Sequence, residues 1–525
     1  MSEASDPQVT AVRATTRWIG LGVLSLALFM ASMDNTILNV ALPTLARALT
    51  ASNDQLQWTV DSYQVTYAGC LLIAGSLVDR WGRTRTFLSG VAVFGVCSLM
   101  AAFAPNVTIL IWARGLTGIG AALLTPSTLA LVSALFADPR ERTAAFAVWS
   151  GANGAGAGVG PLLSGLLLEH LHWSSIFLIN VPIAMIAVAM GIRYLPRTPG
   201  LRRAGSLDWL GAVSSTAALS LVCWAVISAP GLGVTSPLVL TGLVAGGSLM
   251  ACFIWLESRH PHPILHLGLF RIRRFAVAVA VSGLVTAGGA GAIFVLTQYL
   301  QFVLQYGPWA TGIRVIPVAL AMLAGALSAT WVLHRVGLKP LLVGGLVAIT
   351  AGFGWLATTT FTSTYLSLLP GAVVFGLAAG LLTPAATQAV MDSLPADASG
   401  VGSATQSALM QVGSALGVAL IGSLLAARYR GFLQTNPAVT GLDAGLRQRV
   451  LASTADALDV AAKLPGGTGP ALTQAVQRGF IHGMQAGLGV AAAVVLAAAI
   501  TVMIFFPAHA EDHHLRVADQ AGQPD

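Results

Sequence analysis

Charged residues are scarce in this chain of 525 residues, because Asp, Glu, Lys and Arg together make up only 9% of it. A soluble protein carries about 25%. Apolar residues supply 55% of the chain, and the mean hydropathy is +0.78. So few charges cannot cover a water-exposed surface of this size. The composition therefore excludes an ordinary soluble enzyme, a secreted disulfide scaffold and a nucleic-acid binder, and it indicates that most of the chain is solvated by lipid.

Lysine and cysteine are also rare. The two lysines are Lys339, which precedes proline, and Lys463, which precedes leucine. Neither can complete a GK[ST] phosphate loop, so that loop cannot supply ATP-driven transport here. The four cysteines fall in apolar runs without CxxC spacing, which is typical of packing residues. If transport is active, an ion gradient must therefore drive it, and we expect no cofactor.

Three histidines, His260, His262 and His266, cluster between prolines, but only one carboxylate, Glu257, is near and no cysteine is. This is a poor ligand set for a metal, and we expect none.

Long apolar runs, each long enough to cross a bilayer, fill most of the sequence. Using charges, proline and glycine as boundaries, we predict fourteen membrane-spanning helices. They lie near residues 17–40, 58–78, 86–104, 107–136, 143–168, 173–194, 207–229, 235–256, 276–303, 311–333, 339–359, 365–391, 401–427 and 480–507. An even number places both termini on one side.

The distribution of basic residues predicts that this side is the cytoplasm. Eighteen Lys and Arg residues fall in the segments that would then be cytoplasmic, whereas the short outward loops hold only Arg47 and Arg314. Cytoplasmic loops carry the excess of positive charge, and long translocated loops such as 428–479 are largely exempt. Within that loop, the apolar positions of Leu446–Leu464 predict an amphipathic helix on or near the outer face.

Two pairs of similar segments indicate a duplicated unit. GIGAALLTP at 118–126 matches GLAAGLLTP at 376–384, and DRWG at 79–82 matches HRVG at 334–337, with offsets of 258 and 255. Paired repeats around a midplane site are typical of alternating-access transporters. We therefore predict an all-α membrane protein with two six-helix bundles and two inserted helices. The predicted segments are an N-terminal arm (1–16), the first bundle (17–194), a linker (195–206), the inserted helices (207–256), a cytoplasmic loop (257–275), the second bundle (276–507, with the outward loop 428–479) and a tail (508–525).

Ionisable residues at lipid depth are costly and point to function. Asp34 in the first span and Arg114 in the fourth lie at similar depths, about 10 to 12 Å inside the outer helix ends at 1.5 Å per residue, while Asp61 is shallower. A buried carboxylate near a movable cation can exchange a proton, which suits a coupled transporter. A fixed Asp34–Arg114 pair that only holds helices together is the alternative, and Asp61 can also be a wetted helix-end residue.

Glycines mark two further segments. In Gly75–Arg85, Gly75 is expected to allow close helix approach, Gly82 to adopt the dihedral angles of a tight turn, and the arginines to anchor the cytoplasmic face. In the fifth span, Gly154 with Gly158 and Gly156 with Gly160 are four residues apart and would let another helix pack backbone to backbone, while Pro161 permits a bend. This pattern fits either a sliding hinge or a static close-packed interface.

These motifs together resemble the major facilitator superfamily. Gly75–Arg85 is similar to its loop signature, Arg114–Gly118 to its span-four motif and Gly156–Gly165 to its antiporter motif. The segments Asp34–Pro43 and Trp173–Pro182 resemble the branch of fourteen-span drug:proton antiporters. Two departures are Thr117, where the span-four motif often has Gln, and Gln406 with Gln411, where some multidrug relatives have acids.

The resemblance implies proton-coupled export of a lipophilic drug, antibiotic or related small molecule from a bacterium across its inner membrane, by a monomer that contacts lipid and substrate but no nucleic acid. The site residues expected from the sequence and the resemblance fall into four groups. Proton coupling is assigned to Asp34, Arg114 and Asp61; the substrate cavity to Asn35, Asn39, Tyr63, Gln298, Tyr299, Gln301, Gln406 and Gln411; the cytoplasmic gate to Gly75, Asp79, Arg80, Gly82 and Arg83; and the hinge to Gly156, Gly160, Pro161 and Gly165.

Three alternatives stay open. An exporter of an endogenous metabolite or lipid-like compound would use the same fold, and a proton symporter would reverse the flux. A membrane-embedded enzyme is disfavoured, because the sequence has no helical HExxH and no GxSxG.

Overall fold

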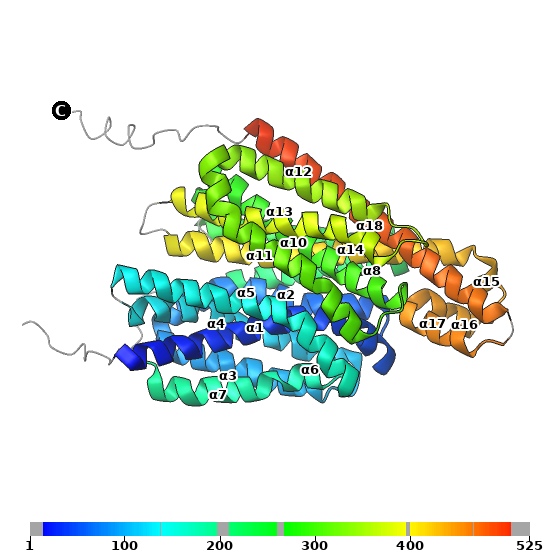
Figure 1. Ribbon diagram of the computed structural model, residues 1–525, viewed down its shortest axis with the longest axis horizontal. Helices are drawn as coiled ribbons and strands as arrows, with labels where there is room; N and C mark the ends of the chain where they lie inside the picture. The colour runs from blue at the N-terminus through cyan, green and yellow to red at the C-terminus, as the bar shows by residue number, and fades with distance from the viewer. Residues whose placement is uncertain are drawn as a thin grey trace, which may run out of the picture.

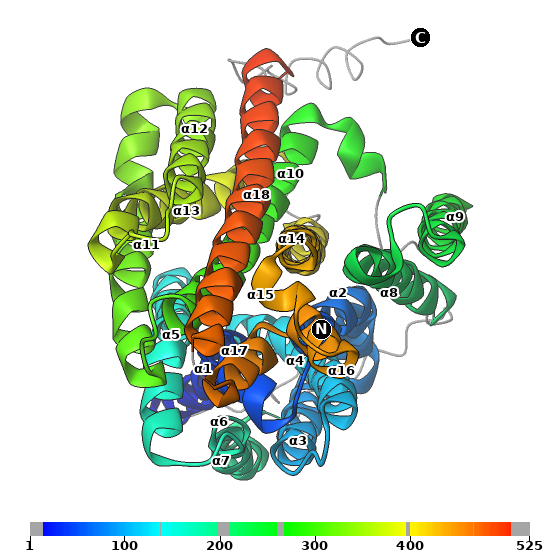
Figure 2. The same cartoon turned by 90° about the vertical axis from the view of Figure 1, so that its right-hand side faces the viewer.

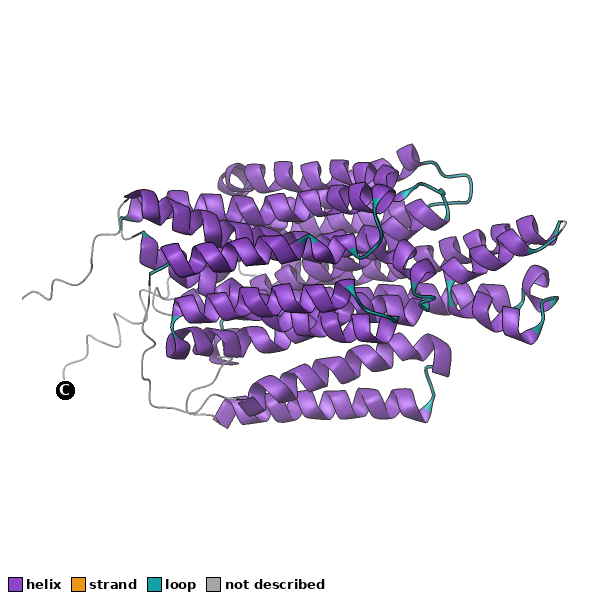
Figure 3. Cartoon of the chain, turned by 90° about the horizontal axis from the view of Figure 1, so that it is seen from below, coloured by secondary structure: helices purple, strands orange, loops and turns teal. Residues whose placement is uncertain are grey.

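The computed structural model describes residues 14–136, 138–196, 209–259, 267–394, 399–465 and 467–505, and every regular element in these ranges is a helix (Figure 3). In chain order they are α1 (Ala14–Ala48), α2 (Asn53–Trp81), α3 (Arg83–Ala102), α4 (Val107–Leu135), α5 (Pro139–His170), α6 (Ser175–Leu178), α7 (Asn180–Tyr194), α8 (Trp209–Leu232), α9 (Pro237–Arg259), the 3-10 helix η1 (Leu267–Arg271), α10 (Arg273–Phe302), α11 (Pro308–Val336), α12 (Leu338–Ala357), α13 (Tyr365–Asp392), α14 (Ser399–Gln434), α15 (Pro437–Thr440), α16 (Ala444–Ala452), α17 (Thr454–Lys463) and α18 (Thr468–Phe505).

Twelve helical segments of the described chain are long and apolar enough to cross a membrane, with α6 and α7 counted as one. Two more long helices, α2 and α5, lie beside them but do not reach that hydropathy. The reason is their composition: α2 carries polar side chains such as Gln57, Asp61 and Gln64 on faces that other helices cover, and α5 is rich in glycine. Fourteen spans and cytoplasmic termini stay predictions.

The two halves of the fold repeat the same helix pairings. In the first half α1 packs on α5, α2 on α4 and α3 on α4; in the second half α10 packs on α14, α11 on α13 and α12 on α13. The turns repeat as well. Gly82 between α2 and α3 has φ of 91°, and Gly337 between α11 and α12 has φ of 80°. Thr50 after α1 and Gln305 after α10 both adopt positive φ (49° and 57°). Gly82 and Gly337 are 255 residues apart, as are Thr50 and Gln305, and this is the offset between DRWG and HRVG in the sequence.

The halves lie side by side and touch at the end of the bundle where α15–α17 protrude (Figure 1). There, the Gln301 side chain of α10 donates to the carbonyl oxygen of Val40 in α1 at 2.8 Å. The Ser423 hydroxyl of α14 donates to Gln57 of α2 at 3.4 Å, and the backbone N–H of Thr454 donates to Asn53 at 3.5 Å. This end is closed in this conformation. The start of α1 and the end of α18 both lie toward the opposite end, in different halves of the fold.

The inserted helices α8 and α9 form a pair on the edge of the molecule (Figure 2). The inner member, α8, packs on α2 of the first half and also on α14 of the second half. The insertion therefore contacts both halves of the fold.

The outward segment 428–479 contains several helices, whereas the sequence predicts a single amphipathic helix in it. α14 continues to Gln434, and α18 begins at Thr468, well before residue 480. The expected helix Leu446–Leu464 is broken at Ser453, whose hydroxyl accepts from the backbone N–H of Asp456 and caps α17. A serine that can bond the backbone favours such a helix start over an uninterrupted helix.

Candidate functional site

A buried ion pair between α1 and α4 forms the centre of the first half. Arg114 donates to Asp34 Oδ2 at 2.5 Å, and the two side chains are only 2% and 0% exposed. The depths inferred from the sequence placed these two residues at one level, and the structure brings them together. The pair needs no other charge to neutralise it.

Asn180 completes the coordination of the carboxylate. Its side-chain amide donates to Asp34 Oδ1 at 2.7 Å and lies 3.4 Å from the Ser98 hydroxyl. Both oxygens of Asp34 thus have a donor. We did not assign Asn180 to the site from the sequence, although it lies within the Trp173–Pro182 segment that carries the resemblance. That segment places Asn180 at the first residue of α7, next to the break after α6.

Aromatic rings enclose the Arg114 guanidinium. Its carbon lies 4.7 Å from the centre of the Tyr63 ring and 6.0 Å from that of Phe177. A cation over an aromatic face is attracted by the ring quadrupole. Arg114 Nε is buried and has no hydrogen-bond partner among the described residues. Protonation of Asp34 would remove the charge that holds Arg114 here, so the arrangement can couple a proton to a change in helix packing.

Asp61 lies apart from this network. It is two residues from Tyr63 on α2, so the two side chains point to opposite faces of the helix at 100° per residue. Its side chain is fully buried, and neither carboxylate oxygen has a hydrogen-bond partner among the described residues. One turn on either side, Trp58 and Val65 pack toward α8 and α14. The structure thus separates the two acids that the sequence grouped together.

Polar residues predicted for the first half of the cavity form short local contacts. Gln64 donates to the side-chain oxygen of Asn35 at 2.7 Å. The Asn39 amide lies 3.5 Å from the carbonyl oxygen of Asn35, and both asparagines are half-buried. Tyr63 is buried under Arg114 rather than open to a cavity.

The residues predicted to line the second half of the substrate cavity are mostly buried. Gln298 donates to the carbonyl oxygen of Phe294 within its own helix, and Gln301 joins α10 to α1. The hydroxyl of Tyr299 has no partner among the described residues. Gln406 donates to the Ser282 and Thr387 hydroxyls at 2.9 and 3.0 Å, and Gln411 is half-buried.

The turn between α2 and α3 carries the predicted gate motif. Gly82 has the expected positive φ, and Arg83 donates to the carbonyl oxygen of Ala130 in α4 at 3.2 Å. The expectation for Gly75 was wrong, because a Cβ there would meet no atom within 4 Å and the glycine mediates no close approach. The side chain of Asp79 lies outside the described residues.

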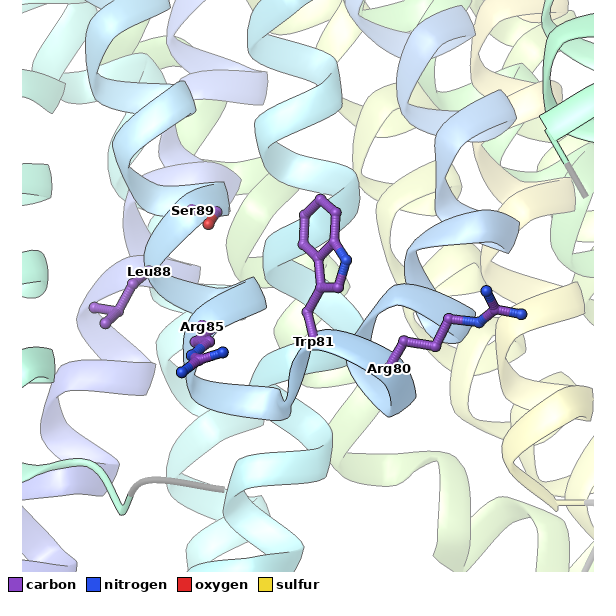
Figure 4. Close-up of a pocket in the computed structure, with 5 residues that line it drawn as sticks. All are labelled: Arg80, Trp81, Arg85, Leu88 and Ser89. Carbon is purple, nitrogen blue, oxygen red and sulfur yellow. The ribbon is translucent and has the colours of Figure 1, made fainter. Parts of the chain in front are cut away.

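A surface pocket of about 490 Å³ adjoins this turn and is lined by Arg80, Trp81, Arg85, Leu88 and Ser89. In Figure 4 the Trp81 ring stands between the side chains of Arg80 and Arg85. Arginines flanking an exposed tryptophan suit the boundary between lipid headgroups and water.

The glycines of α5 lie on two faces of the helix, one packed against other helices and one open. A Cβ at Gly156 or Gly160 would collide with the α1 backbone near Met33, and one at Gly165 would lie 2.8 Å from the Pro308 carbonyl oxygen of α11. In contrast, a Cβ at Gly154 or Gly158 would meet nothing within 4 Å. The expected pairing of Gly154 with Gly158 in a close helix contact is therefore wrong.

Pro161 lies inside α5, and its carbonyl oxygen faces Gly312 of α11. The α5 helix consequently packs its backbone closely on one helix from each half, which suits a hinge or a sliding contact.

Several proteins of known function are similar to this chain in sequence over most of its length. A multidrug efflux pump, LfrA, of Mycolicibacterium smegmatis is 33% identical over 512 residues, which cover 96% of this chain and 100% of the relative. The puromycin resistance protein pur8 of Streptomyces alboniger is 36% identical over 81% of this chain and 85% of its own length. The methyl viologen resistance protein SmvA of Salmonella typhimurium is 32% identical over 92% of this chain and 97% of its own.

Solved transporters share the fold at low sequence identity. The chain aligns with a bacterial homologue of the human lysosomal transporter Spinster with a TM-score of 0.64 and 15% identity, covering 94% of this chain and 98% of that one. A point mutant of the nucleoside transporter NupG aligns with a TM-score of 0.60 and 12% identity over 93% of this chain and 100% of that one.

The profile of the Major Facilitator Superfamily matches residues 24–418. Together with the apolar helices, these relatives identify a multi-pass protein of the bacterial inner membrane. The chain belongs to the major facilitator superfamily, and it is a transporter rather than an enzyme.

Proposed function

We propose that this chain exports a lipophilic, drug-like molecule across the inner membrane in exchange for protons. Relatives named for multidrug efflux and for puromycin or methyl viologen resistance align over most of the chain, which supports drug export. The observation that carries proton coupling is the fully buried Asp34, held between Arg114 and Asn180 in the first half.

In the proposed cycle, Asp34 is ionised while it is paired with Arg114. Uptake of a proton from outside neutralises the carboxylate and leaves Arg114 without its counter-charge, which favours a different arrangement of α1 and α4. Release of that proton to the cytoplasm restores the pair. The backbone contact between α1 and the Gly156–Gly160 face of α5 lies next to Asp34 along α1, so the change can reach the hinge.

The amide side chains that we predict for the cavity support a proposal for the substrate class. Asn35, Asn39 and Gln411 are half-buried amides, and Gln406 is engaged with hydroxyl groups. Amides recognise neutral groups and do not neutralise a second positive charge, so we propose a neutral or singly charged lipophilic substrate rather than a dication. We also propose that the protein acts as a monomer without a cofactor.

A drug-susceptibility panel tests the proposal. The gene would be expressed in a strain that lacks its own efflux pumps, and growth would be measured against puromycin, tetracenomycin C and methyl viologen. We expect resistance to at least one monovalent or neutral compound, and its loss when an uncoupler abolishes the proton gradient. Unchanged susceptibility to every compound, or efflux that survives the uncoupler, would overturn proton-coupled drug export.

A further inference from the structure

The cluster of buried residues beside Asp61 is apolar, and its members come from three helices in different parts of the molecule. The acid lies on α2, and the buried residues beside its face of the helix are Val65 and Ala68 from α2, Leu219, Cys223 and Ile227 from α8, and Ala415 and Ala419 from α14. None of these side chains can donate a strong hydrogen bond to a carboxylate. The wall around Asp61 therefore tolerates a neutral acid and disfavours an ionised one.

Few charged or titratable groups face Asp61 from the helices that pack on α2. On α8, the Cys223 thiol lies within electrostatic range of it. On α14, Arg430 lies about two turns further out and is paired with Asp54 at 3.8 Å. On α4, Arg114 is engaged with Asp34 on the opposite face of α2. Among the described residues, no cation is placed to stabilise an ionised Asp61.

The contact between α2 and α8 is tight along the same face. A Cβ at Gly69, two turns from Asp61, would lie 2.7 Å from the Cβ of Thr216. Because α8 packs on α2 from the first half and on α14 from the second half, it covers Asp61 across the boundary between the halves. Separation of the halves must disturb this cover.

We propose that the inserted helix α8 controls proton access to Asp61, so that Asp61 gains or loses its proton only when α8 separates from α2. This inference rests on the proposed proton-coupled export. It gives a role to the inserted pair α8 and α9, which has no counterpart in the duplicated bundles. While Asp61 is protonated, α8 stays closed over it. Loss of the proton leaves a charge in an apolar wall, which favours separation of α8 from α2.

Cys223 supplies a built-in probe of this movement, because it is fully buried on α8 in the closed state. The variant Cys70→Ser/Cys97→Ser/Cys252→Ser would keep it as the single cysteine. Its labelling by N-ethylmaleimide would be followed from about pH 6 to about pH 9, with and without Asp61→Asn, which preserves shape but stays neutral. A variant that keeps Cys97, a buried cysteine on α3, as the single cysteine measures the effect of pH on a thiol outside this contact.

We divide the labelling rate of Cys223 by that of Cys97 at the same pH. At about pH 9 we expect this ratio to be roughly tenfold higher with Asp61 present than with Asn in its place. Equal labelling rates of the two proteins across the pH range would overturn the inference. If labelling responds as expected but the wild-type protein moves no protons with substrate, the proposed function fails while the control of Asp61 by α8 stands.

A wedge variant tests the same contact without the thiol. Gly69→Leu places a bulky side chain against Thr216, whereas Gly247→Leu on α9 enters open space. In proteoliposomes with a pH gradient and no drug, we expect Gly69→Leu to leak protons several-fold faster than wild type, and Gly247→Leu to match wild type. Should Gly69→Leu fail to fold, Gly69→Ala provides the smaller wedge. Proton leak equal to that of wild type in a folded wedge variant would contradict the inference.

Discussion

At the scale of single residues, the Asp34–Arg114–Asn180 network places a buried ion pair between α1 and α4. Both carboxylate oxygens receive a donor, and the guanidinium lies over Tyr63. Removal of one member of a buried ion pair leaves the other charge uncompensated and costs about 3 to 5 kcal/mol. The interaction therefore contributes to stability, and we propose that it also serves proton coupling; a double variant can separate the two roles.

We expect Arg114→Gln to lower the unfolding temperature in detergent markedly, since Asp34 then remains buried without its counter-charge. The double variant Asp34→Asn/Arg114→Gln should regain most of the lost stability, because no unpaired charge remains. Neither variant should transport drug in cells. Transport by the double variant would show that the pair serves only to hold α1 against α4.

Asn180→Ala removes one donor from Asp34 without changing any charge. A hydrogen bond to a charged group contributes about 1.5 to 3 kcal/mol, so we expect a moderate loss of thermal stability and slower drug efflux. The control is Asn153→Ala in α5, whose exposed side chain makes no hydrogen bond with Asp34; its backbone carbonyl oxygen, which accepts from the Ser32 hydroxyl of α1, is unchanged by the substitution. Equal effects of the two substitutions would remove Asn180 from the site.

At the scale of helices, α5 distinguishes the glycines that matter from those that do not. Gly156 lies against the α1 backbone, with a Cβ placed 3.0 Å from that of Ser32 and 3.1 Å from the Met33 nitrogen, whereas Gly158 faces open space. Overpacking a tight contact costs about 1 to 3 kcal/mol. We expect Gly156→Val to abolish efflux and lower the melting temperature, and Gly158→Val to behave like wild type in both assays. Similar efflux by the two variants would mean that the α1–α5 contact does not need to be close.

The turn between α2 and α3 offers a second contrast between two glycines. Gly82 has φ of 91° and ψ of 144°, an extended conformation at positive φ that is almost restricted to glycine and costs another residue about 1 to 3 kcal/mol. Gly75 is helical and has no neighbour near its missing Cβ. We expect Gly82→Ala to reduce the yield of folded protein and the rate of efflux. Gly75→Ala should retain both, and measured loss of efflux in Gly75→Ala would indicate a contact made only in another conformation.

At the scale of the whole molecule, much of the architecture could be predicted because it follows from apolar length and repetition. The all-helical fold matches the expectation from sequence, and the two halves repeat the same helix pairings. Sequence could not show which face of a helix is covered. Asp34 and Asp61 looked alike as acids in apolar helices, yet one has two donors and the other has none among the described residues. The difference depends on α8 and on Asn180, which only the tertiary packing brings to them.

The contacts that close one end of the bundle can be locked covalently. A Cβ at Gly422 of α14 would lie 3.0 Å from Cγ of Gln57 in α2, so cysteines at these positions are near enough to be bridged. In a background without the four native cysteines, we expect oxidised Gln57→Cys/Gly422→Cys to stop efflux and a reductant to restore it. Each single variant is the control. Undiminished efflux in the fully cross-linked protein would mean that the halves do not part at this end.

The most direct test of the account is proton movement driven by substrate in proteoliposomes that contain only this protein. A trapped pH-sensitive dye would report protons, and ethidium, a lipophilic monovalent cation, would serve as the transported probe. We predict that an ethidium gradient drives an opposing proton flux in the wild type, and that Asp34→Asn abolishes this flux although the variant folds. Proton exchange that is undiminished in folded Asp34→Asn would contradict the central claim.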